Sequence, residues 1–301
     1  MSTNLAILPR PRIIPPKPWV SKPPTPKSRP KSTKYMTIVF GLLQSDSIVF
    51  AADTEETGEF MKFSTPKLYS YARDNGESLV IGGAGAVPSV QTIQQRIGKS
   101  FLADPASFEE ITESLIRQFY EEHVLGQPDQ DFSLIIGGSF KTAEEKYNHR
   151  LWISERGSLR DSEGIAAIGA GMELARTLAG SYVMPSPLPV AELAAVHVLR
   201  LVKEQAHYCG KESMVWTVSG PDVLMMPDRY VRKAEELSKK TDELSALVFM
   251  SLFDADDSLQ FFNARLRTVR DAYIKLSREL GLNYETEKAV NEDFRNNPQG
   301  I

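Results

Sequence analysis

An α+β fold is predicted for the central part of this 301-residue chain, and three observations predict it. Short apolar segments bounded by glycine or polar turns are typical of strands. Longer segments with apolar residues three or four positions apart are typical of amphipathic helices. The order is sheet, helix pair, sheet, helix pair, strand. Two antiparallel sheets packed together, each covered outside by a helix pair, would therefore bury every apolar face.

The expected strands are runs of apolar, often β-branched residues between turn residues. The first hairpin is the clearest, because residues 37–43 and 47–53 are largely apolar and a polar turn at 44–46 joins them. The later segments are shorter, and glycine or polar residues separate them. These further strands are expected at 67–71, 79–82, 132–136, 151–154, 165–168 and 214–218.

Two pairs of helices are expected between the strands. The first helix follows Pro88 and places Val90, Ile93 and Ile97 on one face. The second begins with a capping box formed by Ser107 and Glu110, in which each side chain satisfies a backbone amide of the first turn. Its expected apolar face is Phe108, Ile111, Leu115 and Phe119, and the second helix pair is expected at 172–182 and 190–206.

The two ends of the chain differ from this centre. Residues 1–35 contain nine of the 19 prolines and no acidic residue, which indicates a leader that is extended, disordered or absent from the mature chain. A docking arm for a proline-recognition domain is one hypothesis, and a removable leader is another. The chain is thus divided into the leader, a domain at 36–226 and a C-terminal helical extension at 227–301.

The extension carries a heptad pattern that stops before Gly281. Spacings that alternate between three and four are typical of a coiled-coil seam. Pairing between chains and packing on the parent domain are both consistent with such a seam. Its apolar residues are Leu259, Phe262, Leu266, Val269, Tyr273, Leu276 and Leu280.

Composition excludes several classes of partner. The leader holds eight of the 35 basic residues, so the rest of the chain has 27 basic against 39 acidic residues and repels nucleic acid. Cys209 is the one cysteine, so no intramolecular disulfide can form, and no Cys/His spacing of the zinc type occurs. We expect no cofactor. No apolar run reaches the roughly 20 residues that a membrane helix needs. A cytoplasmic protein is the simplest expectation.

Three residues indicate where chemistry takes place. A three-residue turn at 44–46 would pair residues whose numbers sum to 90, so that Thr37 faces Asp53 across the first hairpin. Antiparallel partners have Cβ atoms about 5 Å apart. Lys67 opens a later strand and is expected to reach the same corner. A hydroxyl, a carboxylate and an ammonium group together form a recognisable nucleophile set.

The chemistry of a threonine nucleophile assigns each group a role. Its hydroxyl is activated by a base, and a free amine on the same residue supplies one. Lys67 would stabilise the developing alkoxide, and Asp53 would keep that lysine oriented and charged. The glycine-rich segment 82–85 ends a strand, and we expect Gly85 to offer a backbone N–H to the oxyanion.

These motifs, in this order, resemble those of proteasome β subunits and bacterial or archaeal proteasome-like threonine hydrolases of the N-terminal-nucleophile (Ntn) family. The resemblance covers about 37–219. It rests on Thr37-Ile38-Val39, Ala51-Ala52-Asp53-Thr54, Thr57, Lys67, Gly83-Ala84-Gly85 and Ile168-Gly169-Ala170-Gly171.

The resemblance implies a four-layer αββα sandwich and a threonine endopeptidase that works through an acyl-enzyme. It implies that Thr57 hydrogen-bonds the peptide backbone, and that Gly83 and Gly85 belong to the same oxyanion- and substrate-binding set. It also implies a peptide or unfolded protein as substrate, a homo-oligomeric ring, an ATP-dependent unfoldase as partner, and no metal.

The sequence also departs from the family. Glu55 replaces the usual arginine, Ala170 replaces a serine that lies near the nucleophile, and the usual Asp-x-x-Ser-Gly is not legible at 209–213. An active threonine peptidase is therefore one hypothesis, and a catalytically silent assembly subunit is the alternative.

Overall fold

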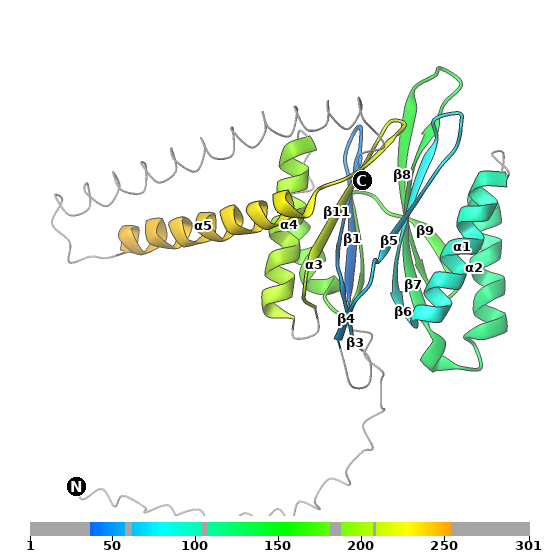
Figure 1. The fold of residues 1–301 in the computed structure, drawn as a ribbon, viewed down its shortest axis with the longest axis horizontal. Helices are drawn as coiled ribbons and strands as arrows, with labels where there is room; N and C mark the ends of the chain where they lie inside the picture. The colour runs from blue at the N-terminus through cyan, green and yellow to red at the C-terminus, as the bar shows by residue number, and fades with distance from the viewer. Residues whose placement is uncertain (1–36, 58–61, 104–107, 181–187, 207–208, 254–301) are drawn as a thin grey trace, which may run out of the picture. The chain divides into compact units, whose positions relative to one another are not determined.

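A computed structural model of the chain describes residues 37–57, 62–103, 108–180, 188–206 and 209–253. Figure 1 shows the arrangement of the elements. Within these ranges the fold is mixed α+β, with two antiparallel five-stranded sheets and five α-helices, so the predicted fold class is confirmed at this level. The leader and the heptad seam of the extension lie outside the described residues.

One sheet contains the first hairpin. Its strand order is β10-β1-β2-β11-β12, all antiparallel, which puts β2 between β1 and β11. The strands are β1 (Ile38–Leu43), β2 (Ile48–Asp53), β10 (Ile165–Gly169), β11 (Ser213–Ser219) and β12 (Asp222–Met225).

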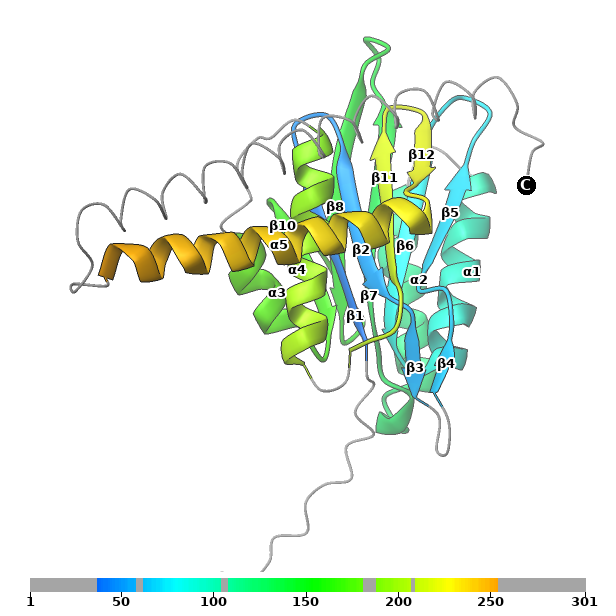
Figure 2. The same ribbon diagram turned by 60° about the vertical axis from the view of Figure 1, so that its left-hand side comes forward.

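The second sheet has the strand order β5-β6-β7-β8-β9, and a separate two-stranded ribbon, β3-β4, extends from the lower end of the first sheet (Figure 2). The strands are β3 (Glu55–Thr57), β4 (Lys62–Ser64), β5 (Leu68–Ala72), β6 (Ser78–Gly85), β7 (Phe132–Lys141), β8 (Tyr147–Glu155) and β9 (Ser158–Asp161).

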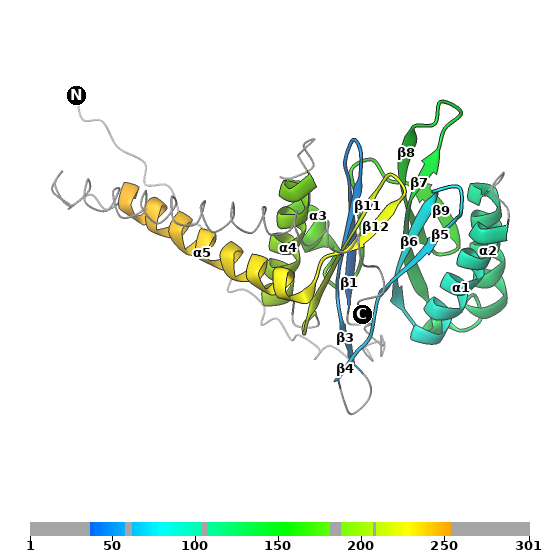
Figure 3. The same ribbon diagram turned by 45° about the horizontal axis from the view of Figure 1, so that its top comes forward.

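The two sheets share a buried apolar cluster, and helices cover their outer faces (Figures 1 and 3). Val39 and Phe50 from the first sheet pack against Val80, Ile135 and Leu151 from the second. Alternate residues of each strand point to the other side, where the helices bury them. The helices are α1 (Val87–Ala103) and α2 (Phe108–His123) on the second sheet, and α3 (Met172–Ala179) and α4 (Leu188–Gln205) on the first.

Helix α5 (Asp228–Phe253) follows β12 and lies within the range predicted as the C-terminal extension. Its first turns pack against α4 and β11, where Val231 and Ala234 join the cluster beneath α4. Further along, Glu243, Ser245 and Ala246 are exposed. Figure 2 shows the helix continuing past α4, away from the sheets.

The structure corrects three details of the sequence prediction. The hairpin register places Val39 opposite Ala52, so paired residue numbers sum to 91 and not to 90. The reason is a four-residue loop at 44–47, closed by a hydrogen bond from Gln44 N to Ser47 O of 2.9 Å. In α2 the buried face contains Thr112 and Ile116 rather than the predicted Ile111 and Leu115, which are half-buried. The short strands β3, β4, β9 and β12 were not predicted.

Helix α1 packs against β5 closely enough to require glycine at one position. A Cβ atom on Gly98 would lie 2.1 Å from the ring of Tyr71, and the Tyr71 hydroxyl donates to Gln94 O at 3.2 Å. The ring is therefore held on both sides. Overpacking of this kind costs about 1–3 kcal/mol, which outweighs the gain of about 1 kcal/mol that alanine gives over glycine within a helix.

We expect Gly98→Ala to lower the free energy of unfolding by up to about 2 kcal/mol, measured by urea denaturation. Gly180→Ala is the matched control, because Gly180 has a right-handed φ of −53° and its Cβ would meet nothing within 4 Å. That variant should be neutral or slightly stabilised. Adding Tyr71→Ala to Gly98→Ala should cost less than the two single losses together, and strict additivity would contradict the steric explanation.

Candidate active site

A buried carboxylate at the end of β2 organises the candidate site. Asp53 is fully buried, and Thr37 is only 3% exposed. The Thr37 hydroxyl donates to Asp53 Oδ1 at 2.7 Å. The backbone N–H of Ile38 donates to the same oxygen at 3.0 Å. The other oxygen, Oδ2, accepts from the N–H of Gly210 at 3.1 Å. Asp53 thus accepts three hydrogen bonds from two neighbouring segments of chain.

The sheet order explains this convergence. Because β2 lies between β1 and β11, residues at the start of both neighbouring strands lie beside its last residue, Asp53. Continuing the observed register places Ile38, not Thr37, across from Asp53. The predicted pairing of Thr37 with Asp53 in the ladder is therefore wrong, but the two side chains still meet, because Thr37 precedes the strand and its hydroxyl reaches the carboxylate.

Backbone contacts fix Thr37 from its other side. Its carbonyl oxygen accepts a hydrogen bond from Ala170 N at 2.8 Å. Gly169 has a φ of +93°, and a Cβ atom there would lie 2.2 Å from the same carbonyl. Both the dihedral angle and the contact require glycine. Gly169 and Ala170 therefore contact Thr37 through the backbone, and the alanine side chain supplies no hydroxyl.

The electrostatics of Asp53 combine opposing effects. Burial raises the pKa of this carboxyl group, because the charged form loses its hydration. The hydrogen bonds from Thr37 and Ile38, the charge of Lys67 and the Gly210 hydrogen bond all act in the opposite direction. The net result is a pKa above the ordinary value of 3.8.

Lys67 lies just before β5, and its charge acts on this corner. Its ammonium group donates to the backbone carbonyl of Glu55 at 3.0 Å. It is also near enough to Asp53 to lower the pKa of that carboxyl group, as an adjacent cation does. The structure therefore brings Lys67 to the same end of the sheets as Thr37 and Asp53.

Two glycines of β6, Gly83 and Gly85, differ in their backbone contacts. The N–H of Gly83 donates to Lys67 O at 3.3 Å, which extends the β5–β6 ladder and uses that donor. Gly85 is the last residue of β6, with a φ of +126°, and a Cβ there would lie 2.5 Å from Asp131 O. Thr57 ends β3 opposite Lys62. Of the two glycines, Gly85 stays the better candidate for an oxyanion donor.

The segment before β11 contributes contacts that were not predicted. Gly210 donates to Asp53, and the carbonyl oxygen of Glu212 accepts from Thr54 N at 3.0 Å. Cys209 is buried, and burial together with the nearby Asp53 and Glu55 raises the pKa of its thiol to about 12. The thiol therefore stays protonated and unreactive. The one hint in the sequence that this segment lies near the site was its position, because 209–213 falls where proteasome β subunits have their Asp-x-x-Ser-Gly.

The described part of the chain contains no group of three or more His, Cys, Asp or Glu side chains able to hold a metal ion. None of the helices within the described ranges is long and apolar enough to cross a membrane.

Comparison with known proteins identifies the fold. No family model and no curated protein matches the sequence. Among solved structures, Anbu (ancestral beta-subunit) from Yersinia bercovieri has a TM-score of 0.60 at 17% identity, over 74% of this chain and 100% of that one. The helical assembly of the Anbu complex from Pseudomonas aeruginosa gives 0.58 at 15% identity, over 74% and 99%. The Anbu (Gly-1) mutant from Hyphomicrobium sp. strain MC1 gives 0.57 at 14%, over 69% and 97%.

These similarities correct the family resemblance drawn from the sequence. The structural neighbours are Anbu proteins, which are proteasome-like but form a distinct family, so the assignment to proteasome β subunits is wrong. The motifs that suggested it lie mostly in the segment around Thr37, Asp53 and Lys67. A short corner of this kind does not distinguish one family from another. At identities of 14–17% the comparison shows an Anbu-like, proteasome-related fold.

Proposed function

We propose that this chain is an Anbu-like threonine hydrolase that cleaves peptide bonds through an acyl-enzyme on Thr37. The fold is taken to be the four-layer αββα sandwich of Ntn hydrolases, with the domain ending near residue 226. The main support is the buried hydrogen bond of 2.7 Å between the Thr37 hydroxyl and Asp53. The nearby charge of Lys67 supports it further. The substrate class is a peptide or an unfolded protein.

Each residue has a role in this reaction. Thr37 Oγ1 attacks the carbonyl carbon of the peptide, and the α-amine of Thr37 takes the hydroxyl proton and delivers it to the leaving amine. Lys67 stabilises negative charge on the attacking oxygen, and Asp53 orients the hydroxyl and balances the lysine charge. The N–H of Gly85 faces the oxyanion, and Thr57 binds the peptide backbone. Water then hydrolyses the ester and restores the hydroxyl.

The α-amine mechanism requires that the chain begin at Thr37. With a residue before it, the nitrogen of Thr37 is an amide and is not basic. We therefore propose that residues 1–36 are removed or absent in the active form. Self-association is proposed as well, since one structural neighbour is described as a helical assembly. A heterologous interface whose rotation does not close gives such an open arrangement. An ATP-dependent unfoldase stays a proposed partner.

A catalytically silent assembly subunit is the second candidate. The observation that favours it is the contact between Ala170 and Thr37, which runs through the backbone alone, without the hydroxyl that catalytic relatives of the proteasome kind place there. Loss of one supporting group lowers a rate by orders of magnitude without changing the fold.

The first test concerns the start of the mature chain. We expect intact mass and N-terminal sequencing of native protein to give Thr37 as the first residue. A threonine-directed electrophile should then label that residue. A native chain that keeps residues 1–36 and is not labelled would contradict the peptidase and support the silent subunit.

The second test concerns the reactive set. Thr37→Ala should abolish peptide hydrolysis while leaving the assembly size unchanged, and Lys67→Ala should do nearly the same. Because these groups act as one unit, the double variant should be scarcely slower than either single variant. Thr37→Ser is the control, since it keeps a hydroxyl and should keep measurable activity. Additive losses would mean that the two residues have separate structural roles.

The third test concerns the charge of Asp53. A carboxyl group with a raised pKa in the folded state destabilises the fold as pH rises through that pKa, since the unfolded state then ionises more readily. The wild type should therefore lose stability as pH rises from about 3.8 to the pKa of Asp53 in the folded protein, and Asp53→Asn should not. We expect the free energy of unfolding of Asp53→Asn minus that of the wild type to increase over this pH range. Urea denaturation over a pH series measures this difference.

A companion variant checks the cause of this pH dependence. Since the Lys67 charge lowers the Asp53 pKa, the same comparison in a Lys67→Met background should show the transition at a higher pH. A relative stability that falls with pH would mean that the protein favours the ionised carboxylate.

A further inference from the structure

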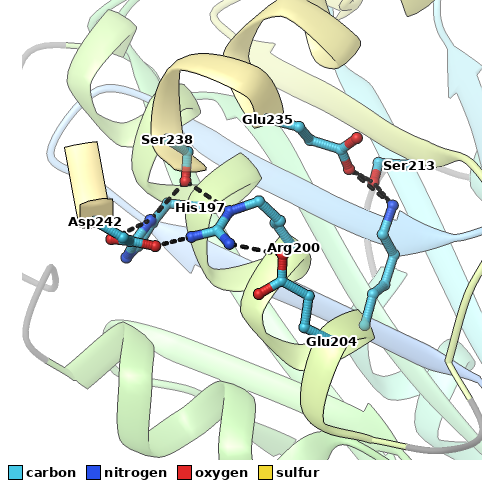
Figure 4. Close-up of polar contacts among 8 residues, drawn as sticks. His197, Arg200, Glu204, Ser213, Glu235, Ser238 and Asp242 are labelled. Atoms are coloured by element: carbon cyan, nitrogen blue, oxygen red, sulfur yellow. Dashed lines mark hydrogen bonds and ion pairs between the residues drawn. The ribbon is translucent and has the colours of Figure 1, made fainter. Parts of the chain in front are cut away.

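Lys203 of α4 contacts two other parts of the protein, helix α5 and the segment that leads into β11. Figure 4 labels two of its partners, Glu235 and Ser213. Its ammonium group donates to Glu235 Oε1 of α5 at 2.7 Å, to Ser213 Oγ of β11 at 2.8 Å, and to Lys211 O at 3.0 Å. The Ser213 hydroxyl in turn donates to the same Glu235 oxygen at 2.5 Å. An ammonium group has three N–H donors. All three are used here, so the direction of each contact is fixed.

This group of contacts is sheltered from water. The side chain of Lys203 is 13% exposed and that of Glu235 is 22% exposed. Exposed ion pairs hold their geometry poorly and are screened by salt. A largely buried pair with additional hydrogen bonds keeps its geometry, and removing one partner leaves a charge without compensation. The Lys203–Glu235 pair is therefore able to hold a backbone segment in place.

The segment that it holds is the one that supplies a donor to Asp53. Gly210 precedes Lys211, and its N–H donates to Asp53 Oδ2. Ser213 is paired with Asp53 across the β11–β2 ladder. Lys211 has a φ of +56°, a left-handed conformation that costs a non-glycine residue free energy unless its surroundings hold it. The hydrogen bond from Lys203 to the carbonyl of Lys211 provides such a restraint.

We propose that Lys203 and Glu235 are positioning residues that connect α5 to the reactive corner, by holding residues 210–213 so that the Gly210 N–H donates to Asp53. Asp53 in turn accepts the Thr37 hydroxyl. Through this sequence of contacts, any displacement of the first turns of α5 changes the hydrogen bonding of the carboxylate. The link to catalysis rests on the proposed function, whereas the link to Gly210 does not.

A neighbouring cluster in Figure 4 provides a natural control. Arg200 also joins α4 to α5, since its guanidinium pairs with Glu204 at 2.8 Å and with Asp242, and donates to Ser238 at 2.9 Å. His197 completes this cluster through Ser238 at 2.7 Å. None of these contacts involves residues 209–213. Loss of Arg200 should therefore weaken the docking of α5 without removing a contact to that segment.

The experiment measures hydrogen exchange at the Gly210 amide in the full-length protein, by mass spectrometry with residue-level fragmentation. Lys203→Met should speed exchange at this amide by about tenfold or more, the change expected when a locally protecting hydrogen bond is released. Arg200→Met should speed exchange along α5 and leave Gly210 within about twofold of the wild type. Unchanged exchange in Lys203→Met, or an equal increase in both variants, overturns the proposal.

Two further measurements keep the test decisive. Glu235→Gln keeps the Lys203 contacts to Ser213 and Lys211 but removes the carboxylate charge. It should therefore raise the exchange rate of the Gly210 amide by less than Lys203→Met does. It also replaces Lys203→Met if that variant does not fold. No increase at Gly210 in this variant overturns the role of Glu235. Exchange does not depend on catalysis, so a response at Gly210 in an inactive protein would reject the peptidase and retain this positioning role.

The charge of Asp53 gives a readout that simple loss of stability does not change. Since the Gly210 hydrogen bond lowers the Asp53 pKa, Lys203→Met should move the Asp53-dependent pH transition in stability upward, and Arg200→Met should leave it in place. Lys67, Glu55 and Cys209 are the other titratable groups at this corner, and both variants retain them. A transition that stays in place in Lys203→Met overturns the proposal.

Discussion

The burial of one carboxylate sets the requirements for this end of the molecule. Asp53 has no exposure to solvent, so its oxygens depend on donors from the protein. Three donors are present, from Thr37, Ile38 and Gly210. They come from the start of β1 and from the segment before β11, which requires that β2 lie between these strands. The strand order of the first sheet and the position of Thr37 are thus both consistent with one hydrogen-bonding requirement.

Many of the contacts around this carboxylate are made by backbone groups. Gly169 approaches the carbonyl of Thr37 where a side chain would collide, and Ala170 donates its amide to the same oxygen. Lys67 is held by the carbonyl of Glu55. Backbone groups have few degrees of freedom once the sheets have formed, so they keep Thr37, Asp53 and Lys67 in register without further side chains. The loss of a side-chain hydroxyl at Ala170 is more easily tolerated in such a frame.

Much of this frame could be predicted from the sequence, because the signals are local. The apolar runs of the strands and the spacing of Val90, Ile93 and Ile97 in α1 depend on neighbouring residues only. The meeting of Thr37 and Asp53 was predicted from one hairpin, although a loop longer by one residue changed the register.

The contacts that were missed join distant parts of the chain. Gly210 lies 157 positions from Asp53, and no periodicity indicates that its amide is a donor there. The family was mistaken for a related reason, since motifs confined to one corner do not encode the rest of a fold. The packing of α5 on α4 likewise depends on residues far apart, so no local pattern indicated that Lys203 reaches both Glu235 and Lys211.

The opposing effects on Asp53 connect stability with the proposed chemistry. Burial raises the pKa of its carboxyl group, and a carboxylate of higher pKa accepts a hydrogen bond from a hydroxyl more strongly. If the pKa of Asp53 rose too far, its carboxyl group would be protonated. A neutral carboxylic acid does not balance the charge of Lys67. The hydrogen bonds from Ile38 and Gly210 limit that rise. If Gly210 is held in place from α4 and α5 as proposed, the balance of hydrogen bonding between Asp53 and Thr37 depends on how these two helices are packed.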